Sequence, residues 1–300
     1  MSHSLEINQQ TRYVLNNGKQ IPVTGYGVYD VSQEETAELV FQALQAGYRH
    51  VDTAVVYGNQ VEVAKGIARF LKETGSSREE IFFTTKLWNT QQGYEETKRA
   101  LSEINADIAP YIKYVDLLLL HSPLTSREKR LGTWKALEEA VLNPNEASLK
   151  IQSIGVSNFG IEHLEELLAQ ATIKPAVNQL ELHPWLPRLE LREYLGRHNI
   201  LAEAYSPLTQ GYKLNEPELL ELEKESGVSK IELLLKWSFL QGFVVLAKSN
   251  KSERIKQNLA VLPKSTGSIS LTEREWKALD KLASHDVVTW GNADPTVYKS

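Results

Sequence analysis

Four side chains in this sequence could act together on one polarised oxygen atom, because each follows a short apolar segment. Asp52 ends one such segment, and Tyr57 lies five residues later in a loop that contains glycine and asparagine. Lys86 and His121 end two further apolar segments. If these segments are neighbouring parallel strands of a barrel, their carboxyl ends lie at one face and the four side chains share one mouth.

These four side chains suit the protonation of a carbonyl oxygen. A tyrosine has a reference pKa of about 10 and donates its proton poorly near neutral pH. A nearby ammonium group stabilises the phenolate, so we expect Lys86 to lower the pKa of Tyr57, with Asp52 as the counter-ion of the buried lysine. His121 can donate a hydrogen bond that positions the carbonyl. The combination is general-acid catalysis with electrostatic support.

A carbonyl reduction also needs a hydride, which no side chain supplies, so a cofactor is implied. The segment 248–258 gathers cations, hydroxyl groups and the start of a predicted helix, which together favour a phosphate group. Its cations favour the 2′-phosphate of NADP(H), whereas an acid at the ribose would favour NAD(H). Ser157, Asn158 and Gln179 could hold a carboxamide, and Tyr205 could stack on a nicotinamide ring.

The elements that must position these residues alternate along the chain. We predict eight strands that end near residues 27, 52, 86, 121, 157, 180, 205 and 247, each followed by a helix. Such alternation implies a parallel sheet, so the fold class is α/β, and eight units in this length predict a (β/α)8 TIM barrel. An open doubly wound sheet is the rival, but no Gly-x-Gly-x-x-Gly sequence follows the first strand.

Further segments are predicted at both ends of the chain. Asn-Gly at 17–18 between two short apolar segments predicts an N-terminal β-hairpin. A capping box over 271–275 begins an extra C-terminal helix over 272–282, followed by a polar tail. Residues 1–10 are polar, and we expect them to be loosely held. Residues 1–300 are expected to form a single domain in which 1–10 and 285–300 are peripheral.

The composition excludes several classes of protein. A net charge of −5 argues weakly against nucleic acid, and the lack of cysteine excludes disulfides, thiolate nucleophiles and cysteine-ligated zinc. Glu181 and His183 lack a second ligand pair at metal spacing, so no metal is predicted. Neither a secretory signal nor an apolar run of roughly 20 residues is visible. We therefore expect a cytoplasmic monomer whose partner is a small carbonyl substrate, without nucleic acid or membrane.

The sequence resembles the aldo-keto reductases from Tyr13 to about Leu282. The stretches that carry the resemblance are 47–57, 82–88, 116–123, 153–159, 177–184, 204–208 and 247–258. The chain is most similar to the small yeast and bacterial reductases of aldehydes, ketoesters and diketones. The resemblance implies an NADPH-dependent oxidoreductase in which Tyr57 is the proton donor and Asp52, Lys86 and His121 complete the catalytic tetrad.

The resemblance also implies a set of cofactor contacts across the barrel mouth. They are Ser157, Asn158, Gln179, Tyr205, Ser206, Leu208, Lys248, Ser249, Asn250, Arg254, Gln257 and Asn258. Independently of the resemblance, the aromatic residues Tyr29, Trp88 and Trp290, together with His121, are candidates for the wall of a substrate pocket.

The chain departs from the family pattern at several positions, and other functions stay open. Gln60 stands where the family usually has Glu, and Gln257 stands where an acid usually lies near the adenine. One alternative is a non-catalytic regulatory or accessory subunit that binds NADPH. Another is a barrel hydrolase that uses a metal, or an aldolase with a Schiff base at Lys86.

Overall fold

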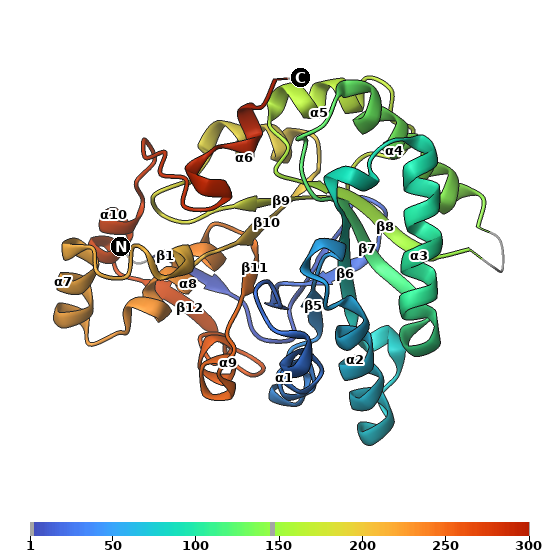
Figure 1. Ribbon diagram of the computed structural model, residues 1–300. Coiled ribbons are helices and arrows are strands. Elements are labelled where there is room, and N and C mark those ends of the chain that lie inside the picture. The colour runs from blue at the N-terminus through green and yellow to red at the C-terminus, as the bar shows by residue number, and fades with distance from the viewer. Residues whose placement is uncertain (1–2, 145–147, 300) are drawn as a thin grey trace.

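The fold is a closed barrel of parallel strands with helices around it, which confirms the predicted fold class (Figure 1). The computed structural model describes residues 3–144 and 148–299. Each barrel strand pairs in parallel with the next, and the last strand closes the ring on the first. The strands are β4 (Thr24–Gly27), β5 (His50–Asp52), β6 (Phe82–Leu87), β7 (Tyr114–Leu120), β8 (Lys150–Ser157), β9 (Val177–Glu181), β10 (Leu201–Tyr205) and β11 (Val244–Ala247).

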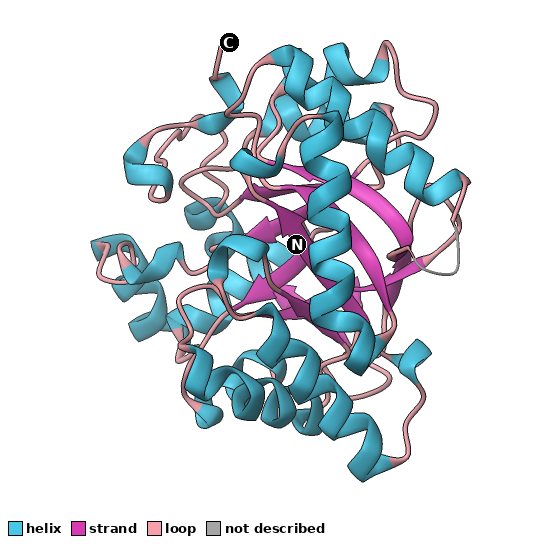
Figure 2. Cartoon of the chain, turned by 45° about the vertical axis from the view of Figure 1, so that its right-hand side comes forward, coloured by secondary structure: helices cyan, strands magenta, loops and turns pink. Residues whose placement is uncertain are grey.

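Helices lie outside the strands on most sides of the barrel (Figure 2). They are α1 (Gln33–Ala46), α2 (Gln60–Thr74), α3 (Tyr94–Ile112), α4 (Arg127–Leu142), α5 (Ile161–Leu168), α6 (Leu189–Arg197), α7 (Pro217–Ser226), α8 (Lys230–Leu240), α9 (Ser252–Leu259) and α10 (Glu273–Leu279). Ser32, Ser126 and Ser229 begin three of them by accepting a hydrogen bond from a backbone N–H of the first turn. None of the described helices is long and apolar enough to cross a membrane.

One helix is long and another is shorter than predicted. α3 extends over about five turns to Ile112, because Ile108 and Ile112 continue its buried apolar stripe. The last helix begins with the predicted capping box at Thr272 and Glu275 but ends at Leu279.

The interior of the barrel has an apolar layer and a polar layer. The apolar layer consists of Leu15, Ile21, Phe82, Leu117, Leu119, Ala176, Val177 and Val244. The predicted hairpin, β2 (Arg12–Val14) with β3 (Gln20–Pro22), supplies Ile21 and leads into Leu15, and each such buried side chain contributes about 1.5–3 kcal/mol. The polar layer lies toward the carboxyl ends of the strands and consists of His50, Asp52, Thr84, Lys86, Gln179 and Glu203. The functional chemistry is therefore concentrated at one end of the barrel.

The N-terminal segment is ordered, so the prediction that residues 1–10 are loosely held is wrong for the described part. β1 (His3–Glu6) pairs antiparallel with β12 (Ser268–Leu271). Ile7 is buried beyond the end of β1, and its backbone N–H donates to Gly267 O. The N-terminal segment is therefore held by β12, which lies near the other end of the sequence. Figure 1 shows β1 beside β12.

The C-terminal segment 285–299 is held against the barrel by buried polar contacts. Arg188 forms an ion pair with Asp294, with 2.9 Å between the closest nitrogen and oxygen, and both side chains are nearly buried. The Tyr298 carbonyl oxygen lies 2.7 Å from Nε2 of His163 on α5. Figure 1 shows this segment running from α10 across α6 toward α5. Its middle part therefore reaches the mouth of the barrel.

Candidate active site

A cleft of about 2250 Å³ opens at the carboxyl ends of the barrel strands. Pockets for a drug-sized ligand measure about 300–1,000 Å³, so this cleft has room for two ligands together. The cleft brings together all the predicted site residues except Lys86: Tyr29, Asp52, Tyr57, Trp88, His121, Ser157, Asn158, Gln179, Tyr205, Ser206, Leu208, Lys248, Ser249, Asn250, Arg254, Gln257, Asn258 and Trp290. Lys86 is fully buried beneath the cleft floor.

Lys86 and Asp52 form a buried ion pair. The Lys86 Nζ atom donates to Asp52 Oδ1 at 2.7 Å and to the Thr53 carbonyl oxygen at 2.7 Å. β5 and β6 are paired neighbours, which places the two side chains side by side in the polar layer. Because each charge is compensated by the other, the lysine can stay charged without contact with water. Its amine is not free to attack a carbonyl, which disfavours the Schiff-base alternative.

Tyr57 lies just beyond β5 in a short 3₁₀ helix, Val55–Tyr57, that Gly58 ends in a left-handed conformation. Its ring centroid is 5.3 Å from Lys86 Nζ. Its hydroxyl group makes no hydrogen bond with any residue in the described ranges, so it is available to a ligand.

The direction of the pKa shift of Tyr57 differs from the expectation. Burial, with the Asp52 carboxylate second, raises the pKa of Tyr57 well above its usual value. The prediction that Lys86 lowers this pKa is therefore wrong for the free protein. The physical reason is that desolvation of the phenolate outweighs a lysine whose charge Asp52 already balances. Tyr57 thus retains its proton at neutral pH.

His121 follows β7 and closes the floor of the cleft beside Tyr57. The two ring centroids are 5.7 Å apart in an edge-on arrangement, and Trp88 meets the imidazole in the same way at 5.0 Å. Burial and, secondarily, Lys86 lower the pKa of His121 well below its usual value, so the imidazole is neutral. Its Nδ1 atom has no hydrogen-bond partner among the described residues.

The residues predicted to hold a carboxamide are tied to one another. Asn158 donates from Nδ2 to the His121 carbonyl oxygen at 2.9 Å and to Ser157 Oγ at 3.0 Å, and its Oδ1 accepts from the Tyr205 hydroxyl at 2.7 Å. Its backbone is left-handed, with φ of 63°, which asparagine tolerates better than most residues. Both hydrogens of the Asn158 amide nitrogen are therefore used, and only its Oδ1 atom can accept a further hydrogen bond. Gln179 lines the cleft next to Asn158.

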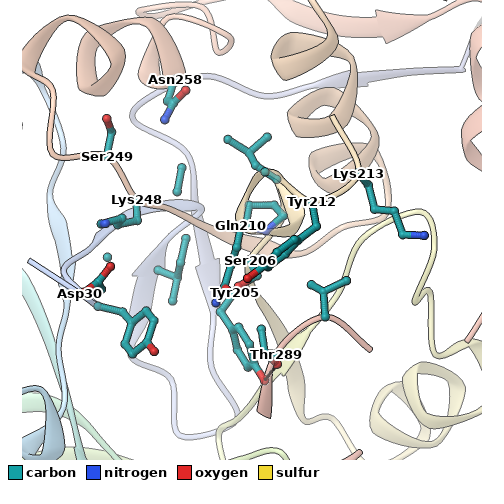
Figure 3. A pocket seen from close by; sticks show the side chains of 18 of the residues that line it. Asp30, Tyr205, Ser206, Gln210, Tyr212, Lys213, Lys248, Ser249, Asn258 and Thr289 are labelled. Carbon is teal, nitrogen blue, oxygen red and sulfur yellow. Dashed lines mark hydrogen bonds between the residues drawn. The ribbon is translucent and has the colours of Figure 1, made fainter. Parts of the chain in front are cut away.

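The cations of the segment 248–258 follow β11 and lie at the start of α9 and along it, and Lys248 and Arg254 line the cleft. Lys248 and Arg254 are exposed, and neither forms an ion pair with a described residue. Ser249 and Asn258 are buried beside them, and the Tyr26 hydroxyl donates to the Ser249 carbonyl oxygen at 2.8 Å. Figure 3 shows Lys248, Ser249 and Asn258 on one side of the pocket and Tyr205 on another. Unpaired cations beside the start of α9 fit a phosphate group.

Aromatic rings form a wall near Tyr57. Trp88 and Trp290 are stacked with centroids 6.0 Å apart and an angle of 11° between their planes. Tyr29, which is 56% exposed, meets the Tyr57 ring edge-on at 5.2 Å. Trp290 donates from Nε1 to the Tyr205 hydroxyl at 3.0 Å. The predicted substrate-pocket residues are therefore contiguous, and the C-terminal segment completes their wall.

Two further segments line the cleft, the loop Gln210–Leu214 and the C-terminal stretch Val287–Thr289. Glu203, which the sequence interpretation did not include, is buried beneath the cleft. Glu181 explains how the segment is held, since its carboxylate accepts from the Val288 N–H at 2.8 Å and from the Thr289 hydroxyl at 2.5 Å. His183 Nε2 is 2.9 Å from the same carboxylate. A charged residue in an otherwise apolar strand was the available signal for Glu203.

Gln60, the departure beside Tyr57, has a structural explanation. Its Nε2 donates to Asp107 Oδ2 at 2.7 Å, and its Oε1 accepts from the Thr85 hydroxyl at 3.1 Å. An amide can serve a hydroxyl donor and a carboxylate acceptor at the same time, whereas a carboxylate here would face Asp107 with like charge.

Replacing Gln60 by Glu is therefore expected to lower the free energy of unfolding by about 1–3 kcal/mol, because a hydrogen bond to a charged group is replaced by repulsion. Urea unfolding monitored by circular dichroism measures this. The double variant Gln60→Glu/Asp107→Asn restores a donor and should recover most of the loss. Equal stability of the single and double variants would contradict this explanation.

Similarity to known proteins covers nearly the whole chain. Residues 24–284 match the sequence pattern of the Aldo/keto reductase family. An uncharacterized oxidoreductase of Saccharomyces cerevisiae is 41% identical over 286 residues, which are 94% of this chain and 98% of that protein. Glyoxal reductase of Bacillus subtilis is 39% identical over 273 residues, 89% of this chain and 91% of that enzyme.

Solved structures give the same result. An aldo/keto reductase from Brucella melitensis superposes with a TM-score of 0.78 at 36% identity, covering 91% of this chain and 99% of that one. The Bombyx mori aldo-keto reductase in complex with NADP has a TM-score of 0.81 at 28% identity, covering 97% of this chain and 99% of that one. The region that matches the family pattern, residues 24–284, includes every barrel strand described above.

Proposed function

Because the chain belongs to the aldo/keto reductase family, we propose that it uses NADPH to reduce aldehydes and ketones, including ketoesters or diketones, to alcohols. One observation carries the proposal. Among the described residues, an unbonded tyrosine hydroxyl and a neutral histidine lie above a buried lysine–aspartate pair, in a cleft that the unpaired cations Lys248 and Arg254 also line.

Tyr57 is the proton donor in this proposal. Its raised pKa keeps the proton on the hydroxyl until the carbonyl oxygen gains negative charge. The phenolate left behind is then stabilised by the Lys86 ammonium group, 5.3 Å from the ring centroid. At an effective dielectric constant of 20 this attraction is about 3 kcal/mol, which corresponds to about two orders of magnitude in rate. Asp52 keeps Lys86 charged and in place.

His121 orients the substrate. As a neutral imidazole it can donate one hydrogen bond to the carbonyl oxygen without competing with Tyr57 as an acid. The stacked Trp88 and Trp290 supply a flat apolar wall for the rest of the substrate.

The described residues fit NADPH. Lys248 and Arg254 would hold the 2′-phosphate, with Ser249, Asn250, Gln257 and Asn258 around the adenosine, and Gln179 would meet the carboxamide. When bound, NADPH supplies the hydride for the carbonyl carbon. Tyr205, Ser206 and Leu208 also line the cleft. The complex of the Bombyx mori aldo-keto reductase with NADP supports this choice of cofactor.

A substrate panel tests the proposed function. NADPH oxidation should be followed by its loss of absorbance with aldehydes, ketoesters and diketones, beginning with glyoxal because of the similarity to glyoxal reductase. Turnover of at least one carbonyl class is expected. NADPH binding without any turnover would instead support the alternative of a non-catalytic regulatory or accessory subunit. A cytoplasmic monomer of one domain stays a prediction.

The preference for NADPH should depend on Arg254. Its replacement by Ala removes charge-assisted hydrogen bonds to the 2′-phosphate, so the Kd of NADPH should rise about 10- to 100-fold while that of NADH changes less than about threefold. Fluorescence titration measures both constants. Lys256→Ala is the matched control, since it removes a cation from the same helix outside the cleft lining. An equal loss for both cofactors would remove the 2′-phosphate assignment.

A further inference from the structure

Glu203 on β10 is a buried acid that the proposed reaction does not use. Its side chain is 0% exposed and lies in the polar layer of the barrel. β10 and β9 pair in parallel with Glu203 opposite Gln179. A carboxyl group is almost never fully buried without a hydrogen-bond partner, so its contacts indicate what it does.

Glu203 shares the amide nitrogen of Gln179 with Asp52. Gln179 Nε2 donates to Asp52 Oδ2 at 2.9 Å and to Glu203 Oε2 at 2.8 Å. An amide nitrogen carries two hydrogens, so these two contacts use both. The amide oxygen, Oε1, is left, and Gln179 lines the cleft. The side chain therefore presents an acceptor, not a donor, to a ligand.

Burial favours the protonated, neutral form of Glu203. Burial, with the Asp52 carboxylate second, raises the pKa of Glu203 to about 8. Asp52 takes the Lys86 ammonium group as its partner, whereas Glu203 Oε1 lies 3.7 Å from Nε2 of His50 and makes no hydrogen bond among the described residues. Burial lowers the pKa of His50 to about 3, so that ring is uncharged. A proton on Oε1 leaves Oε2 free to accept from Gln179.

We propose that Glu203 is a positioning residue for the nicotinamide end of the cofactor. Together with Asp52 it accepts both amide hydrogens of Gln179, and this directs the Gln179 carbonyl oxygen into the cleft. The proposal rests on the proposed function, since the N–H donor that this oxygen accepts from is the carboxamide of NADPH. Without Glu203 one hydrogen of the Gln179 amide loses its acceptor, and the side chain gains conformational freedom. Cofactor binding must then pay the entropy cost of ordering this side chain.

Two ligands and two variants at Glu203 test the proposal. Isothermal titration at pH 7 compares NADP+ with 2′-phospho-ADP-ribose, which lacks the nicotinamide. Glu203→Leu should weaken NADP+ about 3- to 10-fold and leave the fragment unchanged. Glu203→Gln is neutral like the native group and keeps an acceptor oxygen, so it should bind both ligands like the wild type. Glu193→Leu, at an exposed position on α6, is the control for the same change of composition.

Several outcomes would overturn the proposal. Wild-type affinity of the Leu variant for NADP+, or an equal loss for both ligands, would leave Glu203 with a structural role only.

If the Leu variant does not fold, the wild type and the Gln variant are titrated with the 3-acetylpyridine analogue of NADP+, whose acetyl group has no N–H. Both should bind it about 3- to 10-fold more weakly than NADP+, and equal affinity would contradict the proposal. A wild type that binds no NADP+ at all would instead refute the proposed function, and this inference with it.

Discussion

Replacing Tyr57 by Phe should lower the turnover of carbonyl reduction by about 10²- to 10⁴-fold and leave NADPH binding unchanged. The range is the usual contribution of a positioned general acid. The fold should not suffer, because the Tyr57 hydroxyl makes no hydrogen bond with the described residues and its ring contacts with Tyr29 and His121 are preserved by phenylalanine. Steady-state kinetics at saturating NADPH and a fluorescence titration of the cofactor measure the two quantities.

The control for this experiment is Tyr111→Phe, which removes a hydroxyl group from an exposed position on α3. It should turn over substrate like the wild type. Near-native turnover by the Tyr57 variant would refute Tyr57 as the proton donor. A parallel loss of NADPH affinity would mean that the hydroxyl acts in binding.

Replacing Lys86 by Met should have a large effect on both stability and turnover. The Asp52 carboxylate would remain buried with only the Gln179 amide as a partner among the described side chains, and breaking a buried pair in this way costs about 3–5 kcal/mol. Turnover should fall at least about 100-fold, because the ammonium group no longer stabilises the Tyr57 phenolate. Urea unfolding and steady-state kinetics give the two values.

The double variant Lys86→Met/Asp52→Asn separates the two roles of this pair. It removes both charges and keeps an oxygen that accepts from Gln179, so more than half of the lost stability should return. Turnover should stay low, because the positive charge beside Tyr57 is still absent. If turnover returned together with stability, Lys86 would serve the fold alone.

The barrel could be predicted because the alternation of strands and helices is a local property of the sequence. Continuous apolar runs such as Leu117–Leu120 indicate strands buried on both faces, and the capping box at Thr272 marks the beginning of the last helix. The pairing of β1 with β12, which was not predicted, does not follow from any local property of the sequence. The pairing joins residues at opposite ends of the chain, for example Leu5 with Ile269, and neither segment signals the other.

The identities of the candidate site residues could also be read from their places at the ends of apolar segments. Parallel strands carry their carboxyl ends to one face, so Asp52, Lys86 and His121 had to approach one another once the barrel was assumed. Glu203 was missed because it stands in the middle of a strand, where a charge gives no indication of which groups surround it.

The sequence thus determined which functional groups are present and at which strand ends they lie, since both follow from local patterns. Their charge states and orientations depend on the folded barrel. The pKa of Tyr57 rises because the fold partly desolvates it and places the Asp52 carboxylate nearby, and the Gln179 amide is oriented by acids from β5 and β10. Desolvation and hydrogen bonding of this kind add contributions from groups far apart in the chain, and so they are established only when the barrel closes.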